Sequence, residues 1–237
     1  MNKKKNSIKS VEPKNKKQKQ FLNAIVDKSI VFSTGSAGSG KTFLAAAKAL
    51  EYLDFGFVDR IIIVRPVVAT EKLGFLPGGI EEKLDPYLLP LFDAFTGLTD
   101  TKTVQNLLKT KKIEIAPLAF MRGRTFSNAF IILDEAQNTT VAQMTMFLTR
   151  FGENVKVTIT GDLSQSDLSE QNGLAWAKHK LQYCNSVSFI EYSSDHVVRS
   201  DLVKNLLMYI EDSNDKSEKA FNGRVPSFIE SASYGTR

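Results

Sequence analysis

Apolar residues along the chain fall into short, nearly continuous runs, and these runs predict buried β-strands. A strand that is apolar throughout is typical of a parallel sheet covered on both faces, because neither side of the strand meets water. Runs of this kind predict strands at residues 30–34, 60–64, 113–115, 130–133, 155–160 and 187–192.

Between these runs, apolar residues recur every three to four positions, which predicts helices. The expected helices cover residues 18–27, 41–54, 80–95, 101–109, 139–150 and about 197–211. The alternation of strands and helices predicts an α/β fold with a mainly parallel sheet and helices on both faces. The order of the strands does not follow from this pattern.

The two ends of the chain lack the periodicity of the middle. Residues 1–17 predict a disordered basic arm, and residues 212–237 predict a polar C-terminal tail. Residues 18–211 form the predicted folded domain. A chain of 237 residues suffices for one α/β domain with a full core, but not for two domains of this size.

The net charge of +5 belongs to the arm, since residues 1–20 hold eight lysines against the single acid Glu12. Such an arm can bind nucleic-acid phosphates by releasing counterions, or it can simply keep the protein soluble. A second basic turn contains Arg122 and Arg124. Those arginines can contact nucleic-acid phosphates or form ion pairs within the fold.

Cysteine content and hydropathy predict the compartment. Cys184 is the single cysteine, which suits a reducing cytosol and excludes an intramolecular disulfide. No apolar run approaches the roughly 18 residues needed to cross a bilayer. The lysine-rich start lacks the apolar segment of a secretory signal. We therefore expect a soluble, cytoplasmic protein without a membrane partner.

The strongest chemical signal is a glycine-rich loop at residues 35–42, which fits the spacing G-x-x-x-x-G-K-T. Glycines let the backbone curl so that its N–H groups meet phosphate oxygens. Lys41 then places a charge on the β- and γ-phosphates, and the Thr42 hydroxyl completes a Mg²⁺ shell. A ligand-free Gly/Ser loop is the alternative, which the preceding strand and following helix disfavour. The predicted nucleotide-binding residues are Gly35, Ser36, Ala37, Gly38, Ser39, Gly40, Lys41 and Thr42.

Two glutamines, Gln18 and Gln20, precede the first strand, where many NTPases recognise adenine. A side-chain amide donates and accepts at once, which matches the paired groups on the adenine edge. We therefore include both glutamines among the expected nucleotide-binding residues.

Asp134 and Glu135 follow the apolar run at 130–133, at the strand end where open α/β sheets bind ligands. Asp134 suits the outer shell of Mg²⁺, and Glu135 suits the base that orients and deprotonates an attacking water. Two acids after a strand also occur as simple helix caps. The glycine-rich loop favours the catalytic interpretation. Gln165, after the strand at 155–160, is a further candidate for contact with the γ-phosphate or the water.

Together these blocks resemble the PhoH-like family of P-loop ATPases, which is related to superfamily 1 helicase motor cores. The resemblance spans residues 18–209 and departs from the family pattern in two places. Ser36 and Ser39 replace the common Pro and Thr, and Ser200-Asp201 follow Arg199 in place of His-Pro. The blocks that carry it are residues 35–42, 65–66, 71–78, 121–125, 131–140, 161–168 and 197–199.

The resemblance implies a RecA-like sheet order, ATP as the nucleotide, and RNA or single-stranded DNA as partner. It implies the metal role for Asp134 and the water role for Glu135, and it makes Gln165 the sensor of the third helicase motif. Arg199 corresponds to a late arginine that stabilises charge on the transferring phosphoryl group, from the same or a neighbouring subunit.

Helicase cores of the related superfamily hydrolyse ATP between two such domains, whereas this chain predicts one. We therefore expect a head-to-tail homo-oligomeric ring, with six subunits as the expected size. The acidic nuclease cluster of longer family members is absent from the sequence.

The leading hypothesis is an ATPase that hydrolyses ATP to ADP and phosphate, coupled to binding, translocation on or remodelling of RNA or single-stranded DNA. The first alternative is a P-loop phosphotransferase for a small metabolite. It is disfavoured by the lack of an arginine-rich lid and by the adjacent acids, which favour water as acceptor. The second is a nucleotide-gated nucleic-acid-binding module without hydrolysis.

Overall fold

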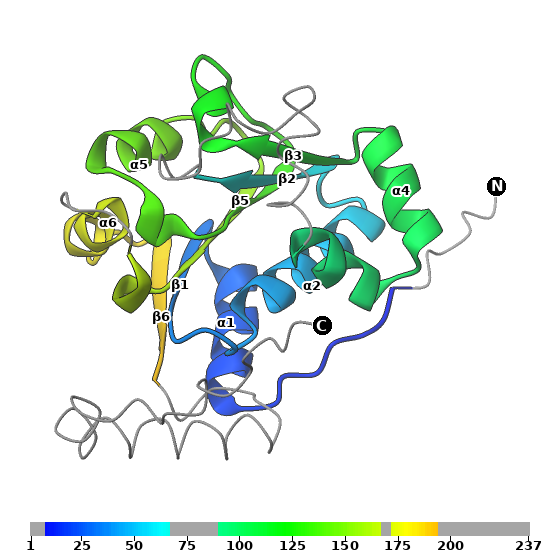
Figure 1. Ribbon diagram of the computed structural model, residues 1–237, viewed down its shortest axis with the longest axis horizontal. Coiled ribbons are helices and arrows are strands. Elements are labelled where there is room, and N and C mark those ends of the chain that lie inside the picture. The colour runs from blue at the N-terminus through cyan, green and yellow to red at the C-terminus, as the bar shows by residue number, and fades with distance from the viewer. Residues whose placement is uncertain (1–7, 67–89, 167–171, 194–237) are drawn as a thin grey trace, which may run out of the picture. The chain divides into compact units, whose positions relative to one another are not determined.

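The computed structural model describes residues 8–66, 90–166 and 172–193. Within these residues six strands form one sheet in the order β3-β2-β4-β5-β1-β6 (Figure 1). Every neighbouring pair in the sheet is parallel. The strands are β1 Ile30–Gly35, β2 Arg60–Arg65, β3 Ile113–Pro117, β4 Ala129–Leu133, β5 Val155–Gly161 and β6 Val187–Tyr192.

Helices cover both faces of the sheet, which confirms the expected α/β fold. Successive residues of β4 alternate between the two cores, so that Phe130 and Ile132 pack against one set of helices and Ile131 against the other. The first core contains α1, α2, α4 and the helical residues 90–98, and the second contains α5 and α6 (Figure 1). The helix bounds are α1 Lys16–Asp27, α2 Lys41–Asp54, α4 Thr101–Lys109, α5 Val141–Leu148 and α6 Gly173–Leu181.

The strand order brings three chemically important strand ends together. β5 lies between β1 and β4 and pairs with both in parallel. The carboxyl ends of these strands therefore meet at the same edge of the sheet, where open α/β sheets bind ligands. The glycine-rich loop follows β1, Asp134 follows β4, and Asp162 follows β5.

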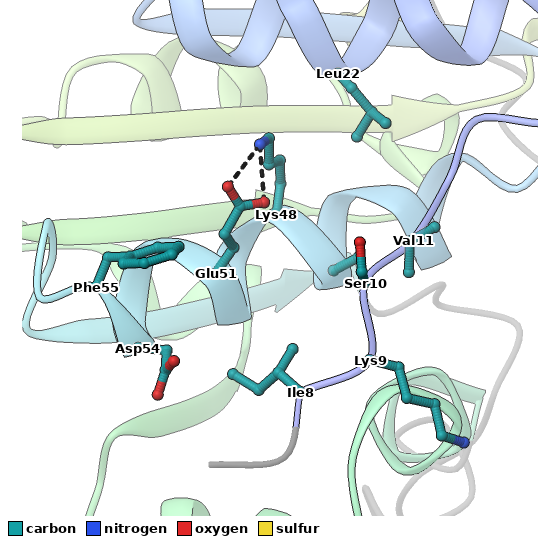
Figure 2. Close-up of a pocket in the computed structure, with 10 residues that line it drawn as sticks. Ile8, Lys9, Ser10, Val11, Leu22, Lys48, Glu51, Asp54 and Phe55 are labelled. Carbon is teal, nitrogen blue, oxygen red and sulfur yellow. Dashed lines mark hydrogen bonds and ion pairs between the residues drawn. The ribbon is translucent and has the colours of Figure 1, made fainter. Parts of the chain in front are cut away.

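The segment before α1 differs from the expected disordered arm. The backbone N–H of Lys9 donates to the Leu98 carbonyl at 2.9 Å, and Ile8 and Val11 pack against the first core. The disorder expected from the lack of apolar periodicity is therefore not found at residues 8–17, because two apolar side chains anchor the segment and α1 already begins at Lys16. Residues 1–7 lie outside the described part. A cavity of about 410 Å³ lies between this segment and α2, away from the glycine-rich loop (Figure 2).

Helix starts are shifted from the expected positions by capping residues. α5 begins at Val141, because Thr140 caps it: the Thr140 side chain accepts from the Gln143 backbone N–H, and the Gln143 side chain accepts from the Thr140 N–H. α1 begins at Lys16, because Asn15 accepts from the Gln18 N–H at 2.9 Å.

Several sequence predictions fall outside the described residues: most of the helix expected at 80–95, the helix expected from 197, Arg199 and the C-terminal tail. Among the helices that the structure does describe, none has the length and apolar character to span a bilayer.

Candidate active site

The loop after β1 depends on three glycines in backbone conformations that other residues rarely adopt. Gly35, Gly38 and Gly40 have φ values of 120°, 78° and 83°. A Cβ on Gly35 would also lie 2.0 Å from the carbonyl oxygen of Tyr192 at the end of β6. The glycine pattern read from the sequence therefore corresponds to a tightly curled backbone.

The same loop leads directly into α2, whose N-cap is Gly40. No side chain caps the first turn of this helix, so its backbone N–H groups stay available at the loop. The helix dipole adds partial positive charge at this end. Loop and helix together offer the electrostatic environment that phosphate oxygens need.

Lys41 lies folded over the loop. Its ammonium donates to the Gly35 carbonyl at 2.6 Å, to the Ser36 carbonyl at 2.9 Å and to the Ser39 hydroxyl at 3.2 Å. Burial lowers the pKa of Lys41. Three carboxylates that oppose this shift by favouring the charged form are Asp162, Glu135 and Asp134.

Thr42 and Asp134 meet across 92 residues of sequence, with the Thr42 hydroxyl donating to Asp134 Oδ1 at 2.8 Å. The Thr160 hydroxyl donates to the same oxygen at 2.7 Å. Arg65 Nε lies 3.3 Å from the other oxygen, Oδ2. The buried carboxylate is therefore held on the hydroxyl that the loop sequence had singled out.

Glu135 adopts a left-handed backbone conformation with φ 55°. Arg65 Nη2 donates to its Oε1 at 3.1 Å, and Gln137 Nε2 donates to its Oε2 at 2.6 Å. Gln137 also accepts from the Asp162 backbone N–H at 3.0 Å. It thereby joins the ends of β4 and β5.

Sequence reasoning did not single out Arg65 or Gln137 as site residues. Both residues belong to sequence blocks described above. Arg65 precedes the proline after β2, and Gln137 lies two residues after Glu135. The available signal for both was a polar side chain at a strand end beside the acid pair.

Gln165 lies close to the acids and is held by Asp162. Its Nε2 donates to Asp162 Oδ2 at 2.7 Å, while the Ser164 N–H and hydroxyl both donate to Oδ1. Burial raises the pKa of Asp162, but the bonds from Ser164, the charge of Lys41 and the bond from Gln165 outweigh it, so the pKa lies below its ordinary value.

A cavity of about 270 Å³ connects these groups. Its lining includes most of the predicted site residues, together with Phe43, Gly161 and Asp162. Gly35, Ser36 and Ser39 act from behind it as partners of Lys41. The cavity is lined by Ala37, Gly38, Gly40, Lys41, Thr42, Phe43, Asp134, Glu135, Gly161, Asp162 and Gln165.

Gln18 supports the loop and does not line this cavity. Its side chain accepts from the Lys14 N–H at 2.7 Å and donates to the Ser39 carbonyl at 2.9 Å. Only 4% of the residue is exposed. Gln20 is exposed on α1 and lies outside the cavity lining as well.

The donor set suits magnesium better than a transition metal. Among the described residues, no group of three or more His, Cys, Asp and Glu side chains could hold a metal ion. Thr42 and Asp134 instead offer two hard oxygen donors beside the phosphate loop. Mg²⁺ is commonly held by few protein ligands, with water and substrate phosphates completing its shell.

Of the two roles expected for Arg124, the structure shows the ion pair within the fold. This residue forms an ion pair with Glu114, with Nη1 2.5 Å and Nη2 3.0 Å from the two carboxylate oxygens. Its guanidinium also lies 4.8 Å from the ring centroid of Phe126. Arg122 is exposed.

Comparison with known proteins agrees with this geometry. The chain is 48% identical over 202 residues to a PhoH-like protein of Mycobacterium tuberculosis, covering 84% of this chain and 57% of that protein. It is 47% identical over 199 residues to Protein PhoH of Escherichia coli, covering 82% and 56%. The chain thus spans little more than half the length of these relatives.

The fold is the RecA-like P-loop NTPase fold. The solved large terminase of a thermophilic bacteriophage matches it with a TM-score of 0.50 at 12% identity, over 82% of this chain and 48% of the terminase. At the sequence level, the family described as PhoH-like protein matches residues 10–211. Because this match covers the glycine-rich loop, the acid pair and nearly the whole folded region, the chain belongs to the PhoH-like protein family.

Proposed function

We propose that this protein binds ATP with Mg²⁺ and hydrolyses it to ADP and phosphate. The observation that carries the proposal is the 2.8 Å contact between Thr42 of the glycine-rich loop and Asp134 of the acid pair. The contact joins the glycine-rich loop to the acid pair, and residues of both line the same cavity. A binding loop alone supports nucleotide affinity, whereas a loop facing two acids also supports hydrolysis.

The Lys41 ammonium donates to loop carbonyl oxygens in the structure. In the proposed complex, β- and γ-phosphate oxygens replace these carbonyls as its hydrogen-bond acceptors. Thr42 and Asp134 are the residues that hold Mg²⁺. When bound, Mg²⁺ neutralises charge on the phosphate oxygens.

Glu135 acts on the attacking water. The water oxygen forms a bond to the γ-phosphorus, the bond from that phosphorus to the oxygen of the ADP leaving group breaks, and the water proton passes to the Glu135 carboxylate. Gln165 lines the same cavity and contacts the γ-phosphate or the water. Arg199 is proposed to stabilise the transition-state charge from the same or a neighbouring subunit.

Hydrolysis is proposed to be coupled to binding, translocation on or remodelling of RNA or single-stranded DNA in the cytoplasm. The lysine-rich start of the chain supports this coupling by its charge. A head-to-tail ring of six subunits is also part of the proposal, because heterologous contacts between identical chains close into rings when the rotation between neighbours allows it. Light scattering that finds only monomer with ATP and magnesium present contradicts the ring.

Phosphate release with and without poly-ribonucleotide or single-stranded DNA, at two salt concentrations, tests the function. We expect hydrolysis that nucleic acid stimulates, with the stimulation weakened by salt. Lys41→Ala is expected to lose ATP binding. Lys48→Ala is the matched control, because Lys48 pairs with Glu51 beside the other cavity, which no residue of the glycine-rich loop lines (Figure 2). This variant is expected to keep native ATP binding. Equal ATP affinity in both variants contradicts the phosphate role of Lys41.

A further inference from the structure

Arg65 contacts both acids of the site without lining the cavity between them and the loop. It is the last residue of β2, and its side chain is 19% exposed. The guanidinium places Nε 3.3 Å from Asp134 Oδ2 and Nη2 3.1 Å from Glu135 Oε1. One planar group therefore spans two adjacent carboxylates.

The backbone fixes Arg65 in this place. β2 pairs in parallel with β4, so that Val64 lies opposite Leu133. Beyond the strands, the Asp134 N–H donates to the Val64 carbonyl at 2.9 Å. The residue after Val64 and the two residues after Leu133 are consequently held side by side.

The orientation of the Glu135 carboxylate depends on contacts with neighbouring side chains, because much of the Glu135 side chain is exposed. Its side chain is 43% exposed, and it lies on a turn where the backbone is left-handed. A glutamate side chain in this setting loses considerable rotamer freedom when it is held in one orientation. Arg65 contacts Oε1 and Gln137 contacts Oε2, which fixes the plane of the carboxylate. Each oxygen keeps one further lone pair for a water.

We propose that Arg65 is a positioning residue for ATP hydrolysis, which holds Glu135 in the orientation that directs the attacking water. The inference rests on the proposed ATPase function and adds to it a residue that does not line the cavity between the loop and the acids. Arg65 acts through one edge of its planar guanidinium: Nε is anchored on Asp134, and Nη2 holds Glu135 at a defined angle to it. A lysine provides the charge without this two-point geometry.

The test compares ATP affinity and single-turnover hydrolysis in Arg65→Ala and Arg65→Lys. We expect ATP affinity within about twofold of the native chain, and a hydrolysis rate about tenfold to a hundredfold lower in Arg65→Ala, the range that misplacement by about 1 Å produces. The hydrolysis rate of Arg65→Lys is expected to lie between those of the native chain and Arg65→Ala. If Arg65→Ala does not fold, Arg65→Lys still tests the inference. A native hydrolysis rate in Arg65→Lys would show that the two-point contact of the guanidinium is unnecessary.

A double-mutant cycle shows whether Arg65 acts through Glu135. In a Glu135→Ala background, Arg65→Ala is expected to change the residual rate by less than about twofold, because its target is gone. A tenfold further loss in that background overturns the inference. Arg124→Ala is the matched control, since it removes another arginine–carboxylate pair away from the cavity and is expected to keep the native rate without nucleic acid.

The positioning role of Arg65 and the proposed ATPase function can be contradicted separately. A native chain that hydrolyses ATP, with Arg65→Ala as fast as native, overturns the positioning role alone. A native chain without hydrolysis overturns the proposed function, and the positioning role falls with it.

Discussion

The side-chain amide of Gln18 donates to the carbonyl oxygen of Ser39 at 2.9 Å, and so ties α1 to the back of the glycine-rich loop. The oxygen of the same amide accepts from the Lys14 N–H, so both ends of the side chain are engaged within the protein. A Cβ on Gly40 would lie 3.1 Å from the Gln18 amide nitrogen, which shows how closely the helix supports the loop. Loop support and adenine recognition therefore make different predictions for Gln18.

Gln18→Ala is expected to weaken ATP and GTP binding by the same factor, about fivefold, because one buried hydrogen bond of about 1 kcal/mol is lost behind the loop. Competition binding with both nucleotides measures this. Asn23→Ala, which removes an exposed amide from the same helix, is the control and is expected to bind as the native chain does. A loss confined to ATP contradicts loop support and favours adenine recognition.

Gly35→Ala is expected to lower the free energy of unfolding by more than about 3 kcal/mol and to abolish ATP binding. Its φ of 120° disfavours any side chain, and the added Cβ would lie 2.0 Å from the Tyr192 carbonyl oxygen. Gly56→Ala separates the cost of the positive φ from the cost of the contact with Tyr192. Its φ is 74°, but nothing lies within 4 Å of the added carbon, so only the backbone cost of about 1 kcal/mol remains.

Chemical denaturation of both glycine variants, with and without ATP, makes the comparison. Equal losses of stability in Gly35→Ala and Gly56→Ala would show that the contact with Tyr192 is relieved at no cost.

The Arg124–Glu114 pair predicts a pH-dependent difference in stability. The hydrogen bond from Arg124 lowers the pKa of Glu114 below its ordinary value of 4.5. The folded state therefore favours the ionised carboxylate. The stabilisation is complete above the ordinary value and is lost as the pH falls through the lowered one. Arg124→Ala is expected to cost about 1 kcal/mol more at neutral pH than in strong acid, because the ion pair is partly exposed to solvent. In strong acid the ion pair contributes nothing, and only the contact of Arg124 with Phe126 is lost.

Denaturation curves of the native chain and Arg124→Ala across this pH range measure the difference. Arg122→Ala removes an exposed arginine two positions away and serves as the control. A difference between native and Arg124→Ala that persists unchanged in acid contradicts the assignment to Glu114.

Much of the fold could be predicted because its signals are local. α2 begins and ends at Lys41 and Asp54, as its strong helix-forming composition predicts. The strand β4 and the acids after it were likewise evident as an apolar run followed by Asp134 and Glu135. The segment at residues 8–15 was predicted to be disordered because it lacks apolar periodicity, and two isolated apolar anchors, Ile8 and Val11, produce no such pattern.

The remaining parts of the site depend on contacts between distant residues. Arg65 meets Glu135 across 70 residues, and Gln137 meets Asp162 across 25. Both contacts arise from the sheet order, in which β4 has β2 on one side and β5 on the other. Because the sequence pattern did not determine that order, neither the Arg65–Glu135 contact nor the Gln137–Asp162 contact could be deduced from it.

ATP binding and phosphate release by Glu135→Gln, measured in the presence of Mg²⁺, test the proposed hydrolysis. The substitution keeps the size of the side chain and the hydrogen-bonding oxygen, but it removes the carboxylate that orients and deprotonates the water. The account predicts native-like ATP affinity with phosphate release reduced at least about a hundredfold. Native phosphate release by Glu135→Gln would contradict it, because the water would then be activated elsewhere.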